Sequence, residues 1–400
     1  MSFLHGVEVL ELDSGPRPIR IAPTSVIGII GTAPNADESA FPLNTPTLIA
    51  GSRLEAAKLD LNGQKQGTLP NALDGILDQA GAVVIVVRIE EGATEAETLA
   101  NVIGGVNAET GAFEGVQALL GAQSVVGFSP RLLIAPGFTH QRLEDEDNPG
   151  KFFANPVVAE LQGIAERLRA VIIADGPNTK DEAAIEYSDD FGSARIYLVD
   201  PWVKVLGPDG NLMDEPPSAR VAGLISKIDN ERGFWWSPSN QLINGIIGTT
   251  RPVDFKMGDR SCRANLLNAK NVSTIIREDG FRLWGNRTLS SDLKWAFLCQ
   301  RRTADIINDA LQASHLWAID RAITKTYYDD VVEGVNNFLS GLKARGAILG
   351  GQCWAPPELN RPSDIADGKA TFDFDFTSPS PAEHITFRSR MVNDYLEELF

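Results

Sequence analysis

Apolar runs alternate with helical patterns along residues 23–255. The strongest run spans residues 82–89 and consists mostly of Val and Ile. Similar runs occur at 25–31, 47–50, 131–136, 170–175 and 194–200. Continuous β-branched runs are typical of strands covered on both faces, as in a parallel sheet. Residues 69–79 and 156–168 instead carry apolar side chains at the i, i+3 and i+4 spacing of amphipathic helices. This alternation predicts an α/β domain with a mostly parallel sheet over residues 23–255, with loops or insertions near 90–128 and 141–151.

The pattern changes after residue 255. Residues 271–277 and 281–287 read as two strands, and Asp279-Gly280 between them is a signal for a tight turn. Two long helical regions follow, at about 291–311 and 316–342. Strands followed by helices and then by further strands are typical of a segregated α+β domain. We therefore predict a second, C-terminal domain over residues 256–391.

Both ends of the chain alternate apolar and polar residues. Residues 371–376 and 385–391 do so on either side of a Ser-Pro-Ser-Pro turn at 378–381, which predicts a hairpin. Residues 3–12 alternate as well, and the chain ends in an apolar segment. We interpret 1–22 and 392–400 as arms that add strands to neighbouring copies. The residues expected to take part in this strand exchange are Phe3, Val7, Val9, Leu10, Phe374, Phe376, Ile385, Phe387, Tyr395, Leu396 and Phe400.

Composition narrows the class of protein. Hydrophobic residues make up 43% of the 400 positions, enough for a substantial core, and the net charge is −17. Such an acidic chain is poorly suited to binding nucleic acid through phosphate neutralisation. The start carries no secretory signal, and no run reaches the ~18 apolar residues of a membrane span. Cys262, Cys299 and Cys353 have neither disulfide-framework nor zinc-site spacing. We expect a cytoplasmic protein without direct membrane contact.

A few residues could carry chemistry. Asp175 and Asp200 each follow a predicted strand, and His140 follows a third, so the three could form a hydrolase or metal site. Asp-Gly and Asp-Pro are also ordinary turn openings, because Asp bonds its own backbone. No Ser or Cys lies in a nucleophile-elbow pattern, and no His pair has metal spacing. We expect no catalytic residue, cofactor or metal, and retain an enzyme as the alternative.

Two further groups could form interfaces. Trp235 and Trp236 are adjacent and either pack at a corner between domains or anchor an interface, where Trp is enriched. Basic residues gather in the long helical regions of an otherwise acidic chain. They form either a solvated face or a docking surface for an acidic partner, and the candidates are Arg321, Lys325, Lys343 and Arg345.

Several segments, in this order, resemble the contractile tail sheath proteins of P2-like phages and R-type pyocins. The likeness covers nearly the whole chain. It is carried by residues 3–7, 25–34, 41–46, 82–88, 130–137, 199–202, 233–240 and 280–289.

The resemblance implies a non-enzymatic subunit that polymerises as stacked hexameric rings around an inner tail tube. In this family, contraction drives the tube through the target cell envelope. The C-terminal domain faces the tube, the α/β domain faces outward, and the arms of neighbouring copies complete a shared sheet, for which the predicted hairpin at 371–391 would be the acceptor. Further partners would be the baseplate and tail terminator proteins. The subunit would be assembled in the host cytoplasm and then belong to the tail of a virion or particle. A self-associating scaffold without a tube is a third hypothesis.

Overall fold

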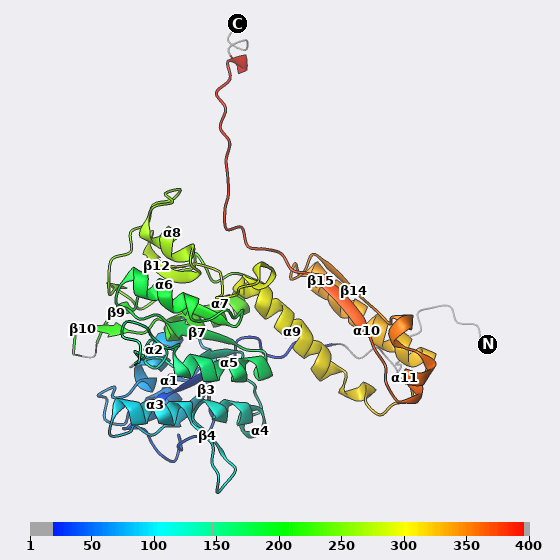
Figure 1. Ribbon diagram of the computed structural model, residues 1–400, viewed down its shortest axis with the longest axis horizontal. Helices are drawn as coiled ribbons and strands as arrows, with labels where there is room; N and C mark the ends of the chain where they lie inside the picture. Colours follow the sequence, from blue (N-terminus) through cyan, green and yellow to red (C-terminus); the bar gives the residue numbers. More distant parts are fainter. Residues whose placement is uncertain (1–18, 146, 208, 396–400) are drawn as a thin grey trace, which may run out of the picture.

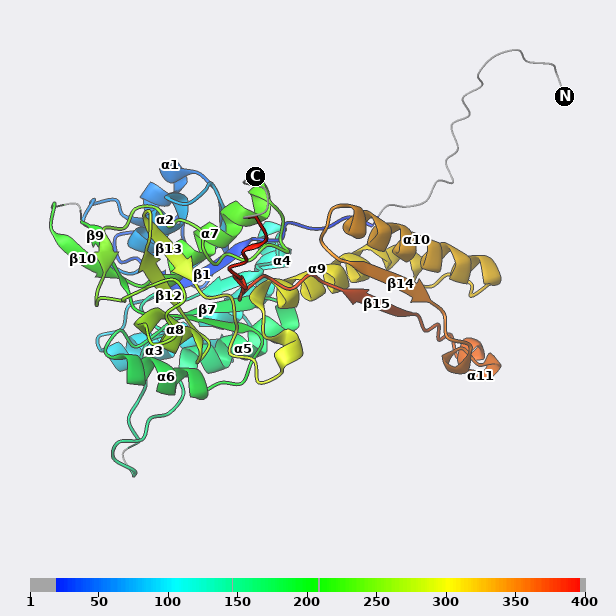
Figure 2. The same ribbon diagram turned by 90° about the horizontal axis from the view of Figure 1, so that it is seen from above.

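The computed structural model describes residues 19–145, 147–207 and 209–395. A larger α/β body and a smaller lobe are connected by α9 (Leu298–Ser314), and both views show them side by side (Figures 1 and 2). After the lobe, the chain returns to the body and then leaves the molecule as an extended C-terminal segment (Figure 1). The predicted α/β architecture is therefore confirmed for the body.

An eight-stranded sheet forms the centre of the body, in the order β13-β12-β8-β7-β6-β1-β3-β2. The inner strands pair in parallel, whereas the edge strands β2 and β13 are antiparallel to their neighbours. The strands are β1 (Ile27–Thr32), β2 (Thr47–Ala50), β3 (Val83–Ile89), β6 (Leu132–Ile134), β7 (Val171–Asp175), β8 (Ile196–Val199), β12 (Val272–Arg277) and β13 (Phe281–Trp284). Their apolar runs are continuous because helices cover both faces of the sheet.

Successive residues of a central strand enter different cores. In β1, Ile27 and Ile29 face the core that contains α2 (Leu69–Leu77) and α7 (Ser218–Glu231). Ile30 faces the opposite core, which contains α5 (Pro156–Leu168). Both helices predicted in this region, α2 and α5, are therefore present and lie on opposite faces of the sheet. The body also contains α6 (Asp181–Asp189), which follows β7 along the chain.

One sequence expectation for the body needs correction. Residues 271–284 do not begin a separate domain, because β12 pairs in parallel with β8 and extends the central sheet. The buried apolar run of β12 fits that position, and the turn to β13 forms as predicted, with φ of 48° at Asp279 and 108° at Gly280. The stretch near 90–128, for which loops or insertions were expected, includes regular structure. It contains α3 (Glu95–Ile103), whose Val102 is fully buried.

The body also contains shorter helices and strands. The stretch near 90–128 also holds the hairpin β4 (Gly105–Val106) and β5 (Phe113–Glu114), followed by η2 (Gly115–Gly121) and α4 (Ala122–Val126). A three-stranded sheet contains β10 (Leu212–Glu215), β9 (Val203–Leu206) and β11 (Gly248–Thr249). The remaining short pieces are α1 (Arg53–Ala56), η1 (Ala57–Leu59), α8 (Arg263–Asn268) and η3 (Leu293–Trp295).

The lobe is built on α10 (Lys325–Ala344), which packs against the antiparallel pair β14 (Gly350–Trp354) and β15 (Asp373–Thr377). Their shared core includes Val335, Leu339 and Cys353, with Phe374 and Phe376 packed against it. The lobe also contains η4 (Leu316–Ala318), η5 (Pro357–Leu359) and α11 (Pro362–Ala366).

The hairpin predicted between residues 371–376 and 385–391 is wrong. β15 pairs with β14 instead, because Phe374 and Phe376 then reach the apolar face of α10. Pro379 and Pro381 follow, and proline cannot donate a ladder hydrogen bond. Residues 385–391 form no strand in the described structure and lie exposed.

Candidate functional site

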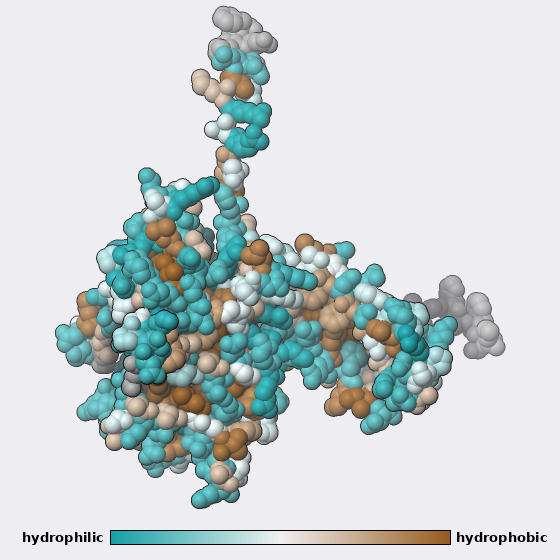
Figure 3. Space-filling model, viewed as in Figure 1, coloured by the Kyte–Doolittle hydropathy of each residue, from teal (hydrophilic) through white to brown (hydrophobic). Residues whose placement is uncertain are grey.

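The extended C-terminal segment is the most exposed apolar feature of the described chain. The exposed fraction is 66% for Ile385, 92% for Phe387 and 98% for Met391. Figure 3 shows apolar and polar residues interspersed along this segment where it projects from the surface. Removing such side chains from water is favourable, by about 25 cal/mol per Å² of apolar area. In the described structure, these apolar side chains therefore remain in contact with water.

Two contacts hold the base of this segment on the body. Arg287 donates through Nε and Nη2 to the two carboxylate oxygens of Glu383, at 2.8 and 2.6 Å. Gln300 donates to the Ser380 hydroxyl at 3.0 Å. The hydrogen bonds to the Glu383 carboxylate raise the pKa of Arg287, so the guanidinium stays charged. The chain is thus fixed near residue 383 and leaves the molecule after it.

The other predicted arm residues are only partly within the described structure. Phe3, Val7, Val9, Leu10, Leu396 and Phe400 lie outside the described residues. Tyr395 is 71% exposed. At the other end, Ile19 and Ile21 are half-buried against the core of the lobe.

The tryptophan pair is divided between two environments. Trp235 lies 5.0 Å from the Phe234 ring and 5.3 Å from the Arg345 guanidinium at the end of α10. It therefore packs at the corner where the body meets the lobe, consistent with the first interpretation. Trp236 remains 46% exposed, with the Arg232 guanidinium 5.1 Å from its ring, and is available for an interface.

The four predicted basic residues do not form one cluster. Arg321 precedes α10 and stacks on Trp317 at 5.1 Å, and Lys325 is the first residue of the helix. Lys343 and Arg345 lie at the other end of α10, roughly 27 Å away at 1.5 Å per residue. Only Arg321 and Lys325 remain as a compact candidate on the far end of the lobe.

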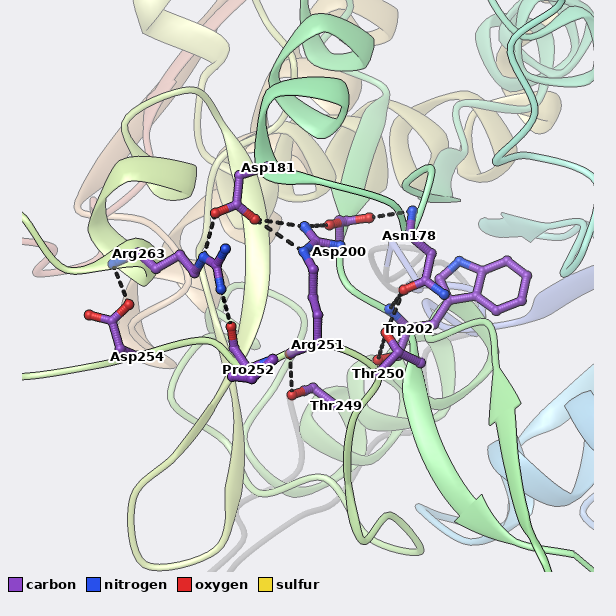
Figure 4. A network of polar contacts seen from close by, with 10 residues as sticks. All are labelled: Asn178, Asp181, Asp200, Trp202, Thr249, Thr250, Arg251, Pro252, Asp254 and Arg263. Carbon is purple, nitrogen blue, oxygen red and sulfur yellow. Dashed lines mark hydrogen bonds and ion pairs between the residues drawn. The ribbon is translucent and has the colours of Figure 1, made fainter.

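Asp200 lies in a polar network at the carboxyl end of the sheet (Figure 4). Arg251 pairs with Asp200 and, at 2.9 Å, with Asp181, while the Asn178 amide donates to Asp200 at 2.9 Å. Arg263 also pairs with Asp181 at 2.6 Å. Burial raises the pKa of Asp200, and the Arg251 charge opposes that rise. The network fastens residues 249–263 to the sheet and leaves Asp200 fully buried.

Asp175 is also fully buried, and its carboxylate is hydrogen-bonded within the fold. It accepts hydrogen bonds from the Ser218 amide and hydroxyl, both at 2.8 Å, and from the Thr139 hydroxyl at 3.1 Å. These bonds tie the first residue of α7 to the end of β7. Burial raises the pKa of Asp175 to about 7. The His140 ring packs edge-on against Trp202 at 4.8 Å, and burial lowers the pKa of this histidine.

These three residues do not assemble a reactive centre. No group of His, Cys, Asp or Glu within the described ranges could hold a metal ion. Cys262, Cys299 and Cys353 are buried free thiols. Among the helices that the structure describes, none is long and apolar enough to span a membrane. The arrangement around Asp175, Asp200 and His140 is that of packed structural groups.

Charged residues along α9 connect it to the body, and the sequence did not reveal their partners. Arg302 pairs with Asp229 at 2.6 Å and also donates to the Thr24 carbonyl. Asp305 pairs with Arg195 at 2.8 Å. Farther along, Asp309 pairs with Arg131 and Arg169. The sequence shows that basic residues gather in this helical region. It does not show their acidic partners, because these lie more than 70 positions away along the chain.

Three family models match successive parts of the chain. They are the Gp18 domain III N-terminal region of the tail sheath protein at residues 24–89, the phage tail sheath protein central domain at 111–289, and the phage tail sheath C-terminal domain at 290–392. A putative prophage major tail sheath protein of Pseudomonas aeruginosa is 44% identical over 100% of this chain and 99% of its own. The tail sheath protein of Escherichia phage P2 is 35% identical over 99% and 98%.

Solved structures show the same fold at lower identity. The contracted helical sheath of the anti-feeding prophage superposes with a TM-score of 0.72 at 21% identity, covering 98% of this chain and 100% of that one. The contracted PVC sheath of an extracellular contractile injection system gives 0.70 at 16%, covering 98% and 99%. Because the sequence likeness spans the full length of both chains, this protein belongs to the phage tail sheath protein family.

Proposed function

We propose that this tail sheath subunit polymerises with copies of itself into stacked hexameric rings around an inner tail tube, and that contraction of this sheath drives the tube through a target envelope. The observation that carries the proposal is the exposed apolar segment 385–391, held on the body at Glu383 and projecting away from the fold. A strand built this way gains its hydrogen bonds and apolar contacts only from another copy.

The proposed lattice uses strand exchange. Residues 1–22 and 392–400 are the arms, with the C-terminal arm extended to include 385–391. The acceptor is the β14–β15 pair, in place of the expected hairpin. Main-chain hydrogen bonds within such a shared sheet do not depend on how the bodies pack laterally. Subunits can therefore rotate and slide while the connectivity of the lattice is kept.

The lobe is proposed to face the tube and the α/β body to face outward. Arg321 and Lys325, at the end of the lobe far from the body, are the proposed tube contacts. The structures similar in fold include anti-feeding prophage sheath assemblies described in a helical contracted state and at a baseplate. We extend both properties to this chain, and add the tail terminator as a partner at the other end of the sheath.

Chain truncation tests the proposal. We expect the full-length protein to form rings or tubes visible by negative-stain microscopy, and a chain ending at residue 383 to stay monomeric with an unchanged circular dichroism spectrum. The matched control is the chain ending at residue 391, which keeps residues 385–391 and should polymerise better than the shorter one. Normal tubes from the chain ending at residue 383 would contradict strand exchange. Co-purification with a small tube protein would separate a sheath from a tube-free scaffold.

A further inference from the structure

The short helix η3 carries an exposed leucine, a lysine and a tryptophan in succession. We call Leu293, Lys294 and Trp295 the η3 surface. Leu293 is 81% exposed, Lys294 is also exposed, and Trp295 is half-buried. The centre of the Trp295 ring lies 5.8 Å from the Lys294 ammonium and 4.4 Å from the Arg301 guanidinium. An apolar side chain thus stands beside a tryptophan with two cations, residue types that are enriched at protein interfaces.

The η3 surface adjoins the point where the C-terminal segment leaves the body. Gln300 donates to the Ser380 hydroxyl at the base of that segment. The next residue, Arg301, stacks on Trp295. Under the proposed function, the C-terminal segment binds another copy, so that copy comes within reach of the η3 surface.

The β4–β5 hairpin and α4 carry exposed apolar side chains in an acidic part of the chain. Val106 is 62% exposed, Phe113 is 37% exposed, and Val125 is 56% exposed. Residues 89–130 contain six glutamates and no aspartate, lysine or arginine. One of these glutamates is Glu109, which is exposed in the turn between β4 and β5. We call Val106, Glu109 and Phe113 the hairpin surface.

The η3 surface and the hairpin surface lie far apart on the body. Leu289, which precedes η3, donates to the Ile196 carbonyl of β8, whereas η2, which follows β5, packs on β3. Strands β8 and β3 are four positions apart in the sheet, roughly 19 Å at about 4.8 Å per strand. Figure 1 shows β4 and α4 at one end of the body and the C-terminal segment leaving beyond the other. The two surfaces therefore meet only when copies pack head to tail.

We propose that the η3 surface of one copy docks on the hairpin surface of the next, which forms a head-to-tail contact between α/β bodies. Leu293 packs against Val106 and Phe113, and the Lys294 ammonium lies beside the Glu109 carboxylate. Burial of the apolar side chains stabilises the contact. This inference rests on the proposed function and adds a contact between bodies to the contacts made by the terminal arms.

Charge favours this pairing over contacts between two like surfaces. Two hairpin surfaces that faced each other would bring together the glutamates of residues 89–130, and two η3 surfaces would bring together Lys294 and Arg301 of both copies. Like charges placed across an interface disfavour a wrong partner, whereas opposite charges favour the right one. A contact between unlike surfaces leaves one of each free on every pair of copies, so it continues from copy to copy as a helical polymer requires.

Charge-swapped variants test the docking. We expect Leu293→Asp/Lys294→Glu and Val106→Lys/Glu109→Lys each to raise the critical concentration for polymerisation about tenfold or more. A chain that carries all four substitutions again has opposite charges across the contact, and it should recover most of the loss. Sedimentation and negative-stain microscopy measure polymerisation.

The matched control makes the same kinds of change elsewhere on the body. Leu54 is 83% exposed, and the Lys58 side chain is 43% exposed. We expect Leu54→Asp/Lys58→Glu to polymerise as wild type. All four side chains changed in the test variants are exposed, so an unchanged circular dichroism spectrum assigns their loss of polymerisation to the contact.

A disulfide between copies gives a second measurement. Leu293→Cys/Val106→Cys places one thiol on each surface, and the three native cysteines are buried. We expect mild oxidation of the assembled polymer to produce a ladder of covalent oligomers on a denaturing gel, and neither single substitution to give species larger than a dimer. An assembled double variant that gives no ladder overturns the contact.

The outcomes separate this inference from the proposed function. If the chain ending at residue 383 stays monomeric while both charge-swapped variants polymerise as wild type, strand exchange stands and the docking contact is overturned. If the truncated chain polymerises normally and the charge-swapped variants do not, strand exchange fails and the docking contact stands.

Discussion

Individual carboxylates at the ends of β7 and β8 organise the body without doing chemistry. Asp175 holds the start of α7, and Asp200 holds the chain around Arg251. Both were identifiable from the sequence as aspartates that follow apolar strands. Their partners were not, because Ser218 and Arg251 lie 43 and 51 positions farther along the chain. The enzyme hypothesis is therefore set aside, in agreement with membership of a structural protein family.

The buried Asp175 carboxyl predicts a pH effect on stability. Its pKa is raised from 3.8 to about 7 in the folded protein. The folded state thus binds a proton more tightly than the unfolded chain, and the stabilisation is complete below pH 4 and lost as the pH rises through 7. We expect the free energy of unfolding of wild type, relative to Asp175→Asn, to fall by up to about 4 kcal/mol between pH 4 and 7. Urea unfolding of the unassembled proteins at several pH values measures this difference, and a constant difference would contradict it.

Elements with continuous apolar patterns were predictable, whereas the choice of strand partner was not. The strands of the central sheet and helices α2 and α5 were all predicted near their observed positions. The assignment of β12 to the second domain failed because a buried apolar strand of this kind fits a sheet in either domain. The terminal hairpin failed for a related reason: Phe374 and Phe376 pack on α10, which local alternation cannot reveal. Of the site, the apolar pattern of residues 385–391 was visible in the sequence, but the anchor of this segment at Arg287 was not.

The ion pair between Arg302 of α9 and Asp229 of the body leads to a prediction about stability. The side chains of Arg302 and Asp229 are only 4% and 2% exposed. Replacing Arg302 leaves a buried carboxylate without its cation, so we expect Arg302→Met to lower the free energy of unfolding by roughly 3 kcal/mol. Amides of α9 and of residues 24–26 should then exchange faster with deuterium. The neighbouring Arg301→Met is the control, because Asp305 keeps its pair with Arg195. Equal losses in the two variants would refute a specific role for the Arg302 pair.

At the scale of the whole molecule, the described subunit consists of an α/β body, a small lobe joined through α9, and an extended C-terminal segment that we propose binds other copies. The net charge of −17 disfavours close approach of subunits unless specific contacts oppose the repulsion. Paired strands supply such contacts in the proposed lattice. Contacts to the tube have a different requirement, since they must template assembly and still release when the sheath contracts. Exposed charges meet that requirement because each one contributes little and is screened by salt.

Arg321 and Lys325 provide the test of the tube contact. Both are exposed at the end of the lobe far from the body. We expect Arg321→Glu/Lys325→Glu to reduce the number and length of sheaths formed on purified tubes, with the largest reduction at low ionic strength, where the wild-type attraction is strongest. Lys256→Glu/Arg260→Glu makes the same change on exposed residues of the body and should assemble normally. Electron microscopy of mixtures with the tube protein gives both measurements. Sheaths of normal length from the lobe variant would show that these two residues do not face the tube. Polymerisation in the absence of the tube is the control. If it is unchanged in both variants, the substitutions have left the proposed strand-mediated contacts between subunits intact.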